Sequence, residues 1–200
     1  MAKASSAPRT SRGEKTHRRL LDAARIEIGS KGFAEASVSS ITRQAGVGQG
    51  TFYIYFESKE EIMRTLVLEM GRDLRQQLSD INSSAPNRMA AERAGLRHFI
   101  AFARENPDLY RIVQEAQFVD DKVYRAYFEE FASGYRKALE LAVEAGEMSK
   151  GDLEVRAWLL LGIGRSMGEV YGLWRTDVDI DYVVDIIMDI LENGVKAHGS

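Results

Sequence analysis

The sequence predicts an all-α protein of about nine helices, three in a small N-terminal head and six in a larger C-terminal body. Three observations predict this fold class. Apolar residues recur at spacings of three and four along nearly the whole chain, which is the period of an amphipathic helix. No segment shows the strict alternation of a half-buried strand. In the head, two short helical patterns flank a glycine turn, as in a helix-turn-helix.

Composition limits what the chain can be. Its 200 residues, 44% of them hydrophobic, suffice for one ordinary domain or for a small domain and a larger one. The absence of cysteine excludes disulfides, thiolate metal sites and cysteine nucleophiles. The longest apolar run, around residues 157–163, is too short to span a bilayer. We therefore expect a soluble cytoplasmic protein with no membrane segment, no cofactor and no metal.

The head is expected to follow a basic tail. Residues 1–12 combine Ala, Ser, Pro, Lys and Arg without periodicity, which is typical of a disordered segment. A first helix is expected to start at Glu14. The helix-turn-helix head then covers residues 13–58, and the body covers residues 59–200.

The central motif occupies about residues 37–56. Ser37 is a favourable N-cap for its first helix, which ends at Gly46 and Gly48. In its second helix, Phe52 and Phe56 lie four residues apart, so they share one face and are expected to anchor the helix to the core. The opposite face is centred on Gly50 and Ile54, and its flanks are Gln49, Thr51, Tyr53 and Tyr55.

Charge is distributed unevenly along the chain. The first 56 residues carry nine Lys or Arg against four Asp or Glu, whereas the rest carries eighteen against twenty-six. Residues 1–56, which comprise the basic tail and most of the head, therefore have a net charge of +5 and the remainder −8, although the whole chain has only −3. A cationic N-terminal region is attracted to phosphate over long range. Together with the motif, this asymmetry predicts a double-stranded DNA partner.

A long helix is expected to connect the head to the body. Ser58 and Glu61 match a capping box, so this helix starts at Lys59, and its apolar stripe continues to about residue 82. The other body helices are expected at residues 89–105, from 107 through 113, from about 121 to 145, from 153 to about 174 and from 180 to 196.

A series of residues in fixed register extends over roughly residues 20–62: Ile41, Ala45-Gly46-Val47, Gly50-Thr51-Phe52-Tyr53, Tyr55-Phe56 and Ser58-Lys59-Glu60. This series resembles the TetR family of bacterial repressors. Two positions depart from the family pattern. Thr42 stands where alanine is usual, and Gly48 stands where a hydroxyl residue is common.

The resemblance implies which residues meet DNA. Ser39, Gln49 and Gly50 are expected to approach base edges, and Gln49 can bind adenine through two hydrogen bonds. Phosphate contacts position a protein on DNA without carrying sequence information. These contacts are expected from Thr51, Tyr53, Tyr55 and Lys59, and Ser37 completes the predicted DNA-binding set.

A dimer interface is predicted in the last two helices. Gly164, Gly168 and Gly172 recur every four residues, and each glycine inside a helix costs about 1 kcal/mol relative to alanine. A smooth face permits close approach of another helix, and the resemblance implies dimerisation through four helices on a two-fold axis. Close packing within one subunit is the alternative. The last helix contributes Val183, Ile187, Ile190 and Leu191.

The resemblance also implies a small-molecule cavity in the body. Aromatic walls and polar groups there suit an anionic or acyl-thioester effector, and a cationic aromatic ligand is the competing interpretation. The candidate lining residues are Tyr110, Arg111, Gln114, Phe118, Tyr124, Phe131, Trp158, Arg165 and Tyr171.

These observations predict a ligand-responsive transcriptional repressor that binds a palindromic operator as a homodimer and is released by a small molecule. The connecting helix is expected to transmit the ligand signal. The alternative is a helical interaction module without sequence-specific DNA binding. An enzyme is not expected, because the three histidines are scattered and no glycine-rich phosphate loop or serine elbow is present.

Overall fold

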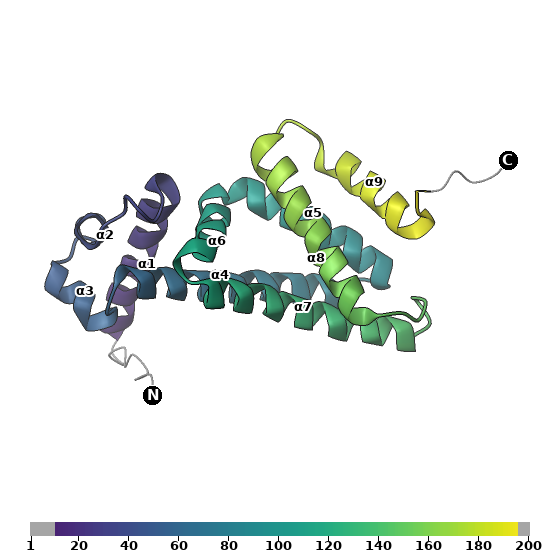
Figure 1. Cartoon of the computed structure of the whole chain (residues 1–200), viewed down its shortest axis with the longest axis horizontal. Coiled ribbons are helices and arrows are strands. Elements are labelled where there is room, and N and C mark those ends of the chain that lie inside the picture. The colour runs from purple at the N-terminus through teal and green to yellow at the C-terminus, as the bar shows by residue number, and fades with distance from the viewer. Residues whose placement is uncertain (1–10, 196–200) are drawn as a thin grey trace. The chain divides into compact units, whose positions relative to one another are not determined.

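The computed structural model describes residues 11–195. Within that range, helices are the only regular secondary structure (Figure 1). This confirms the predicted all-α class. None of the described helices is long and apolar enough to cross a membrane. The elements are α1 (Ser11–Lys31), α2 (Val38–Ala45), α3 (Gln49–Tyr55), α4 (Lys59–Ser84), α5 (Arg88–Glu105), α6 (Pro107–Val119), α7 (Asp121–Glu144), α8 (Leu153–Glu169), the π-helical turn η1 (Val170–Trp174) and α9 (Ile180–Asn193).

Most helix ends lie within a few residues of their predicted positions. The first helix is an exception, because α1 already begins at Ser11, inside the predicted tail. The rest of that tail, residues 1–10, lies outside the described residues. The short helix predicted from residue 107 is also longer, since α6 continues to Val119.

Side-chain caps explain several helix starts. Asn87, Asp152 and Asp179 each accept a hydrogen bond from a backbone N–H in the first turn of the following helix. At the start of α4, Ser58 Oγ accepts from the N–H of Glu61 at 3.2 Å. The Glu61 carboxylate accepts from the N–H of Glu57, so the second half of the predicted capping box forms one residue earlier than expected.

The chain divides into two compact units, with boundaries inside α4 and α7. The first unit contains residues 1–72 and 108–127, and the second contains residues 73–107 and 128–200. The predicted boundary at residue 58 therefore does not coincide with a boundary between compact units. The assignment of ligand binding to residues 59–200 stays a prediction.

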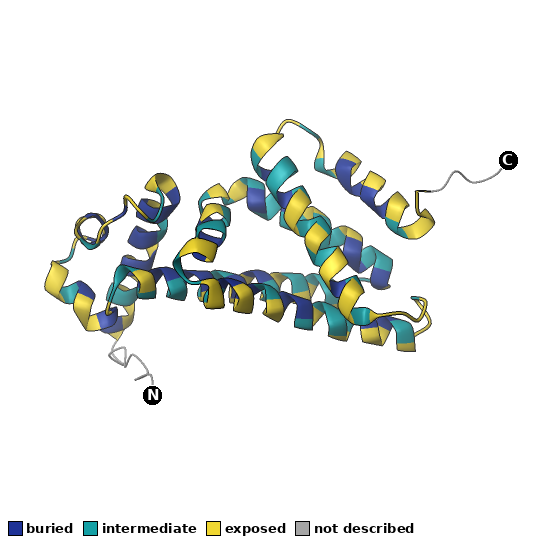
Figure 2. Cartoon of the chain, viewed as in Figure 1, coloured by how far each residue is buried: buried dark blue, intermediate teal, exposed yellow. Residues whose placement is uncertain are grey.

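The first unit has one core to which five helices contribute. Leu20 of α1, Ile41 of α2, Phe52 of α3, Ile62 of α4 and Ile112 of α6 have no exposed surface (Figure 2). Burying a side chain of this kind contributes about 1.5–3 kcal/mol. The short helices α2 and α3 are therefore held by packing, because helices of this length are not stable alone.

In the second unit, α5 packs against α8, η1 and α9. The core on this side contains Ile100 of α5 and Val183, Val184, Ile187 and Met188 of α9. The apolar face of α9 thus covers α5.

A buried ion pair lies at the other end of α5. The side chains of Arg88 and Glu92 are each only 8% exposed and are 3.0 Å apart. Arg88 also hydrogen-bonds Asn82, and its backbone N–H donates to Glu147 at 2.6 Å. Burial raises the pKa of Glu92, an effect that the nearby Arg88 opposes. The pair joins the end of α4 to the start of α5 and to the turn after α7.

Candidate nucleic-acid interface

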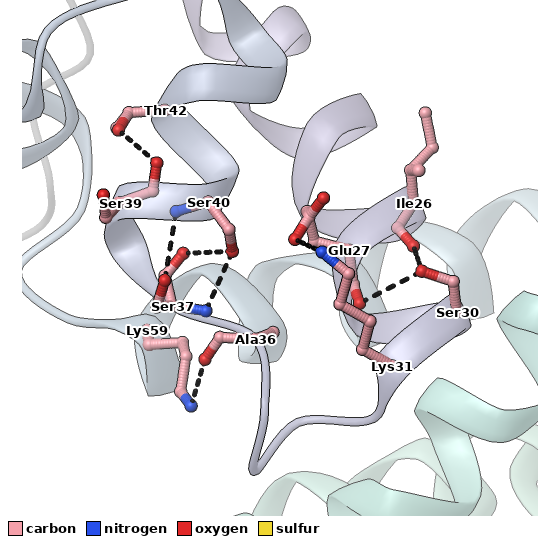
Figure 3. Close-up of polar contacts among 10 residues, drawn as sticks. All are labelled: Ile26, Glu27, Ser30, Lys31, Ala36, Ser37, Ser39, Ser40, Thr42 and Lys59. Atoms are coloured by element: carbon pink, nitrogen blue, oxygen red, sulfur yellow. Dashed lines mark hydrogen bonds and ion pairs between the residues drawn. The ribbon is translucent and has the colours of Figure 1, made fainter.

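The geometry of the helix-turn-helix is fixed at both ends of α2. Ser37 Oγ accepts from the N–H of Ser40 at 3.0 Å, and Ser40 Oγ accepts from the N–H of Ser37 at 3.1 Å (Figure 3). At the other end, Gly46 has φ +65°, a left-handed conformation that favours glycine. Arg19 of α1 reaches this end and donates to the carbonyl of Ala45 at 2.5 Å. The turn between α2 and α3 is therefore held by α1.

Glu27 forms an ion pair with Lys31 one turn further along α1. Its buried carboxylate accepts from Lys31 at 2.7 Å (Figure 3). Hydrogen bonds from Lys31 and from Ser40 of α2 lower the pKa of Glu27. Thr42, which departs from the family pattern, is also buried, and its hydroxyl donates to the carbonyl of Ser39 at 3.2 Å. A hydroxyl at this position is therefore satisfied within α2.

Aromatic packing anchors α3. Phe52 and Phe56 are buried, as predicted, and their ring centroids lie 5.7 Å apart. His17 of α1 stacks on Phe56 at 5.0 Å. Tyr55 is also buried, only 8% exposed, with its ring 6.0 Å from His17.

The buried position of Tyr55 corrects its predicted place beside the exposed face. Tyr55 lies three residues after Phe52 and one before Phe56, so helical geometry turns it towards the same core. The exposed face of α3 consists instead of Gln49, Gly50, Tyr53 and Ile54, at positions i, i+1, i+4 and i+5.

Neither the backbone conformation nor the packing of the chain requires glycine at Gly48 or Gly50. Neither Gly48 nor Gly50 has a positive φ. Leaving aside its chain neighbours and the backbone of its own helix, a Cβ built on either residue meets no heavy atom within 4 Å. Glycine in a helix costs about 0.5–1 kcal/mol relative to alanine. Packing within the chain therefore does not explain why glycine stands at Gly48 or Gly50.

The structure brings most of the predicted DNA-binding set to one side of α2 and α3. Ser39, Gln49, Gly50 and Tyr53 are exposed, and Thr51 is half-buried. Ser37 is exposed as well, but its hydroxyl is used as the N-cap of α2. Their contacts with bases or phosphates stay predictions.

Lys59 is placed differently from its prediction. Its ammonium donates to the carbonyl of Phe33 at 2.5 Å and to that of Ala36 at 2.7 Å (Figure 3). It also lies 4.1 Å from the centroid of the Phe33 ring. The lysine therefore ties the start of α4 to the loop between α1 and α2, because two of its three donors are occupied by backbone carbonyls.

Two residues of this region lie outside the predicted DNA-binding set. Ile54, which the sequence already placed on the exposed face with Gly50, is 64% exposed on α3. Arg19 carried no signal in the sequence, because its contact with Ala45 joins residues 26 positions apart.

Within the first unit, helix α6 contacts α1 and the loop that precedes α2. Asp108 accepts from Arg25 of α1 at 2.6 Å and 3.3 Å. A Cβ on Gly29 would lie 2.6 Å from the Cβ of Asp108, so glycine permits this close approach. Glu115 accepts from the N–H of Phe33 at 2.5 Å. Phe33 thus contacts α6 through its N–H and α4 through its carbonyl.

The predicted ligand-binding residues fall into both units. Tyr110, Arg111, Gln114, Phe118 and Tyr124 lie in the first unit, whereas Phe131, Trp158, Arg165 and Tyr171 lie in the second.

Their surroundings differ. Phe118 is 88% exposed in this chain, and its predicted role in ligand binding stays a prediction. Tyr124 and Phe131 are buried. The guanidinium of Arg165 lies 5.4 Å from the centroid of the Phe128 ring, and the Trp158 indole donates to Glu154.

The glycines of the predicted dimer interface pack within one chain. A Cβ on Gly168 would lie 2.5 Å from the Phe99 ring, and one on Gly172 would lie 2.7 Å from the Cβ of Ala103. A Cβ on Gly164 would lie 4.0 Å from the same phenylalanine ring, which is an ordinary contact. Close approach of α8 and η1 to α5 within one chain therefore explains Gly168 and Gly172, which is the alternative that the sequence left open.

The predicted α9 residues divide between the core and the surface. Val183 and Ile187 belong to the buried core, and Leu191 packs against it. Ile190 is exposed. The inward direction of Val183 and Ile187 corrects their assignment to a dimer interface, because α9 uses them to cover α5.

Comparison with known proteins agrees with this geometry. Residues 20–66 match the family model described as bacterial regulatory proteins, tetR family. The chain is 26% identical to the fatty acid metabolism regulator protein of Bacillus subtilis (strain 168), over 88% of this chain and 93% of that protein.

Two solved structures have the same fold. The fatty acid degradation regulator FadR from Bacillus halodurans has a TM-score of 0.80 at 18% identity, covering 92% of this chain and 97% of that one. FadR from Bacillus subtilis, in complex with stearoyl-CoA, has a TM-score of 0.78 at 20% identity, covering 90% of this chain and 100% of that one.

Proposed function

The chain belongs to the TetR family of DNA-binding transcriptional regulators, and from this premise we propose that it is a dimeric repressor released from a palindromic operator by an acyl-thioester. The observation that carries the proposal is the exposed face of α3. Gln49 and Tyr53 project from it, and Gly50 leaves its backbone open. The net positive charge of residues 1–56 attracts this face to DNA.

Each exposed residue of α3 has a separate role in this proposal. The Gln49 amide reads adenine, a pairing that contributes about 1–3 kcal/mol of discrimination. The hydroxyl of Tyr53 binds a phosphate, because the ring packs edge-on against Phe52 at 5.4 Å and the side chain remains 58% exposed. Gly50 permits the helix to lie deep in the major groove.

A second copy of the chain covers the outer faces of α8 and α9. Both helices expose large apolar side chains: Val155 and Leu159 on α8, and Tyr182, Ile186 and Ile190 on α9. Within each helix these residues recur every four positions, so they share one exposed face, and exposed apolar faces mark interaction surfaces. A dimer through this face places two heads on a two-fold axis, which suits a palindromic site.

The dimer is tested by placing a charge on this face. Ile186→Glu should yield monomers by sedimentation velocity at concentrations where the wild type sediments as a dimer, because a buried unpaired carboxylate is costly. Ile26→Glu, on an exposed isoleucine of α1, is the matched control and should leave the dimer intact. A dimeric Ile186→Glu protein would contradict the proposed interface.

Relatives support the choice of effector. One solved relative is in complex with stearoyl-CoA, and the curated relative is a fatty acid metabolism regulator. The second unit offers both chemistries that a long acyl-thioester requires. Aromatic side chains such as Phe131 can contact an acyl chain, and Arg165 provides a cation for phosphate.

Within the first unit, helix α6 is placed to pass a displacement on to the DNA-reading helices. Its contacts through Asp108 and Glu115 reach α1 and the loop that precedes α2. A shift of α6 therefore moves Phe33, which Lys59 also holds. Since effector and DNA favour different arrangements of α6, each must weaken the binding of the other by the same factor.

The experiment is selection of duplexes from a random pool by the full-length protein, followed by titration of the recovered duplex with stearoyl-CoA. Recovery of a palindrome and release by stearoyl-CoA are expected. Asp108→Asn should reduce the release, because the Arg25 contact loses its charge. Recovery of no preferred sequence would reject the DNA-reading role, whereas a palindrome that stearoyl-CoA does not release would reject only the effector.

A further inference from the structure

Gly50 and Ile54 lie four residues apart on α3, so they share its exposed face. Helical side chains lean towards the N-terminus, which directs Ile54 towards the turn that contains Gly50. Leaving aside the chain neighbours and the helix backbone, no heavy atom, the Ile54 side chain included, lies within 4 Å of a Cβ built on Gly50. The space above the Gly50 backbone is therefore open, with an exposed aliphatic side chain at one end, and we call this open space the recess.

Nothing within the first unit accounts for an isoleucine at this position. Its neighbours Phe52, Tyr55 and Phe56 are buried and already anchor α3. Ile54 itself is 64% exposed and faces away from them. A single exposed isoleucine is common on protein surfaces. Ile54, however, lies beside an open glycine on the helix proposed to enter the major groove, where it can contact an apolar group of a base.

The chemistry of the major groove identifies the group that fits the recess. Base pairs present hydrogen-bond donors and acceptors there, and thymine adds one apolar group, its 5-methyl. A donor or acceptor placed against Ile54 would lose water without gaining a partner, which is unfavourable. A methyl group instead exchanges water for an apolar contact.

On the basis of the proposed DNA-binding function, we propose that Gly50 and Ile54 form a receptor for the 5-methyl group of one thymine in each operator half-site. Gly50 provides the space and Ile54 provides the apolar contact. The preceding residue, Gln49, reads a neighbouring base by hydrogen bonding, so α3 combines two modes of readout. Ile54 is then a specificity-determining residue.

The test replaces thymine with uracil, which removes only the 5-methyl group. The probe is the duplex recovered by selection with the full-length protein, substituted at one thymine position at a time in both half-sites. At the thymine position that contacts the recess, loss of the buried methyl from one half-site should weaken wild-type binding roughly fourfold. Loss from both half-sites should weaken it about fifteenfold. Fluorescence anisotropy at fixed salt concentration measures the change.

Variants connect the effect to the recess. Ile54→Ala should bind the thymine and uracil duplexes equally, and Gly50→Ala should also lose the difference because its methyl fills the recess. Gln49→Ala should keep the full difference while binding more weakly. Ile26→Ala is the matched control, because it removes an exposed isoleucine from α1, and it should behave as the wild type.

The outcomes separate this inference from the proposed function. If the wild type selects a palindrome but no thymine position responds to uracil, or if Ile54→Ala keeps the full response, the methyl receptor is wrong and the regulator remains. If no duplex is selected at all, the DNA-binding function itself is rejected.

Discussion

Replacing Gly50 with alanine should stabilise the protein and weaken its binding to DNA. The stability effect follows from local geometry. Gly50 lies in the first turn of α3, its φ is not positive, and a Cβ there meets no described atom within 4 Å. Alanine therefore adds no clash and reduces the backbone entropy lost on folding, which should raise the free energy of unfolding by roughly 0.5 kcal/mol.

The effect on DNA binding has the opposite sign. If the DNA approaches the Gly50 backbone closely, the added methyl overfills that contact, and overpacking costs about 1–3 kcal/mol. Affinity for a selected duplex should then fall fivefold or more per half-site. Urea unfolding measures the first effect, and fluorescence anisotropy with a labelled duplex measures the second.

A matched control is available in α7. Gly134 is also exposed, helical and free of atoms within 4 Å of a built Cβ. Gly134→Ala should stabilise the protein by about 1 kcal/mol and leave DNA affinity unchanged. If Gly50→Ala bound DNA as tightly as the wild type, the open face of α3 would not be the surface that meets the groove.

Three further predictions follow from the same structure. Gly172→Ala should lower the free energy of unfolding in urea by about 1–3 kcal/mol, because its Cβ would lie 2.7 Å from the Cβ of Ala103, which no side-chain rotation can move aside; an unchanged midpoint would refute this packing. Lys59→Ala should destabilise the fold by roughly 1–3 kcal/mol through two lost carbonyl contacts, without changing the salt dependence of DNA binding. If the slope of log affinity against log salt concentration instead became shallower by about 0.9 for each lost phosphate contact, Lys59 would bind phosphate as first predicted. Because the pKa of Glu27 lies below its ordinary value of 4.5, its carboxylate stabilises the fold above about pH 4.5 and loses this effect as the pH falls through the lowered pKa. In Glu27→Gln, the melting temperature should therefore depend less on pH in this acidic range than in the wild type. Equal pH dependence in the two proteins would contradict the stabilising role of the Glu27 carboxylate.

Local signals in the sequence predicted most of the fold. Ser37 and Gly46 mark the two ends of α2 through a cap and a left-handed glycine, and Phe52 and Phe56 identify the buried side of α3. Each of these signals acts within one helical turn, so it can be read from neighbouring residues.

Contacts between distant segments could not be predicted in the same way. Lys59 was expected at phosphate, but it binds carbonyls 23 and 26 residues earlier in the chain. Gly168 and Gly172 correctly predicted close helix packing, yet periodicity does not say whether the partner helix belongs to the same chain. Tyr55 is a different case, because its spacing from Phe52 already indicated burial and the flanking position assigned to it was wrong.

The central claim is that α3 reads a specific duplex as part of a two-fold dimer. The most direct measurement is an anisotropy titration of the full-length protein, at one salt concentration, against the selected palindrome and a scrambled duplex of equal length. The claim predicts two chains per palindrome and binding at least about a thousandfold tighter than to the scrambled duplex. Equal affinity for the two duplexes would contradict it.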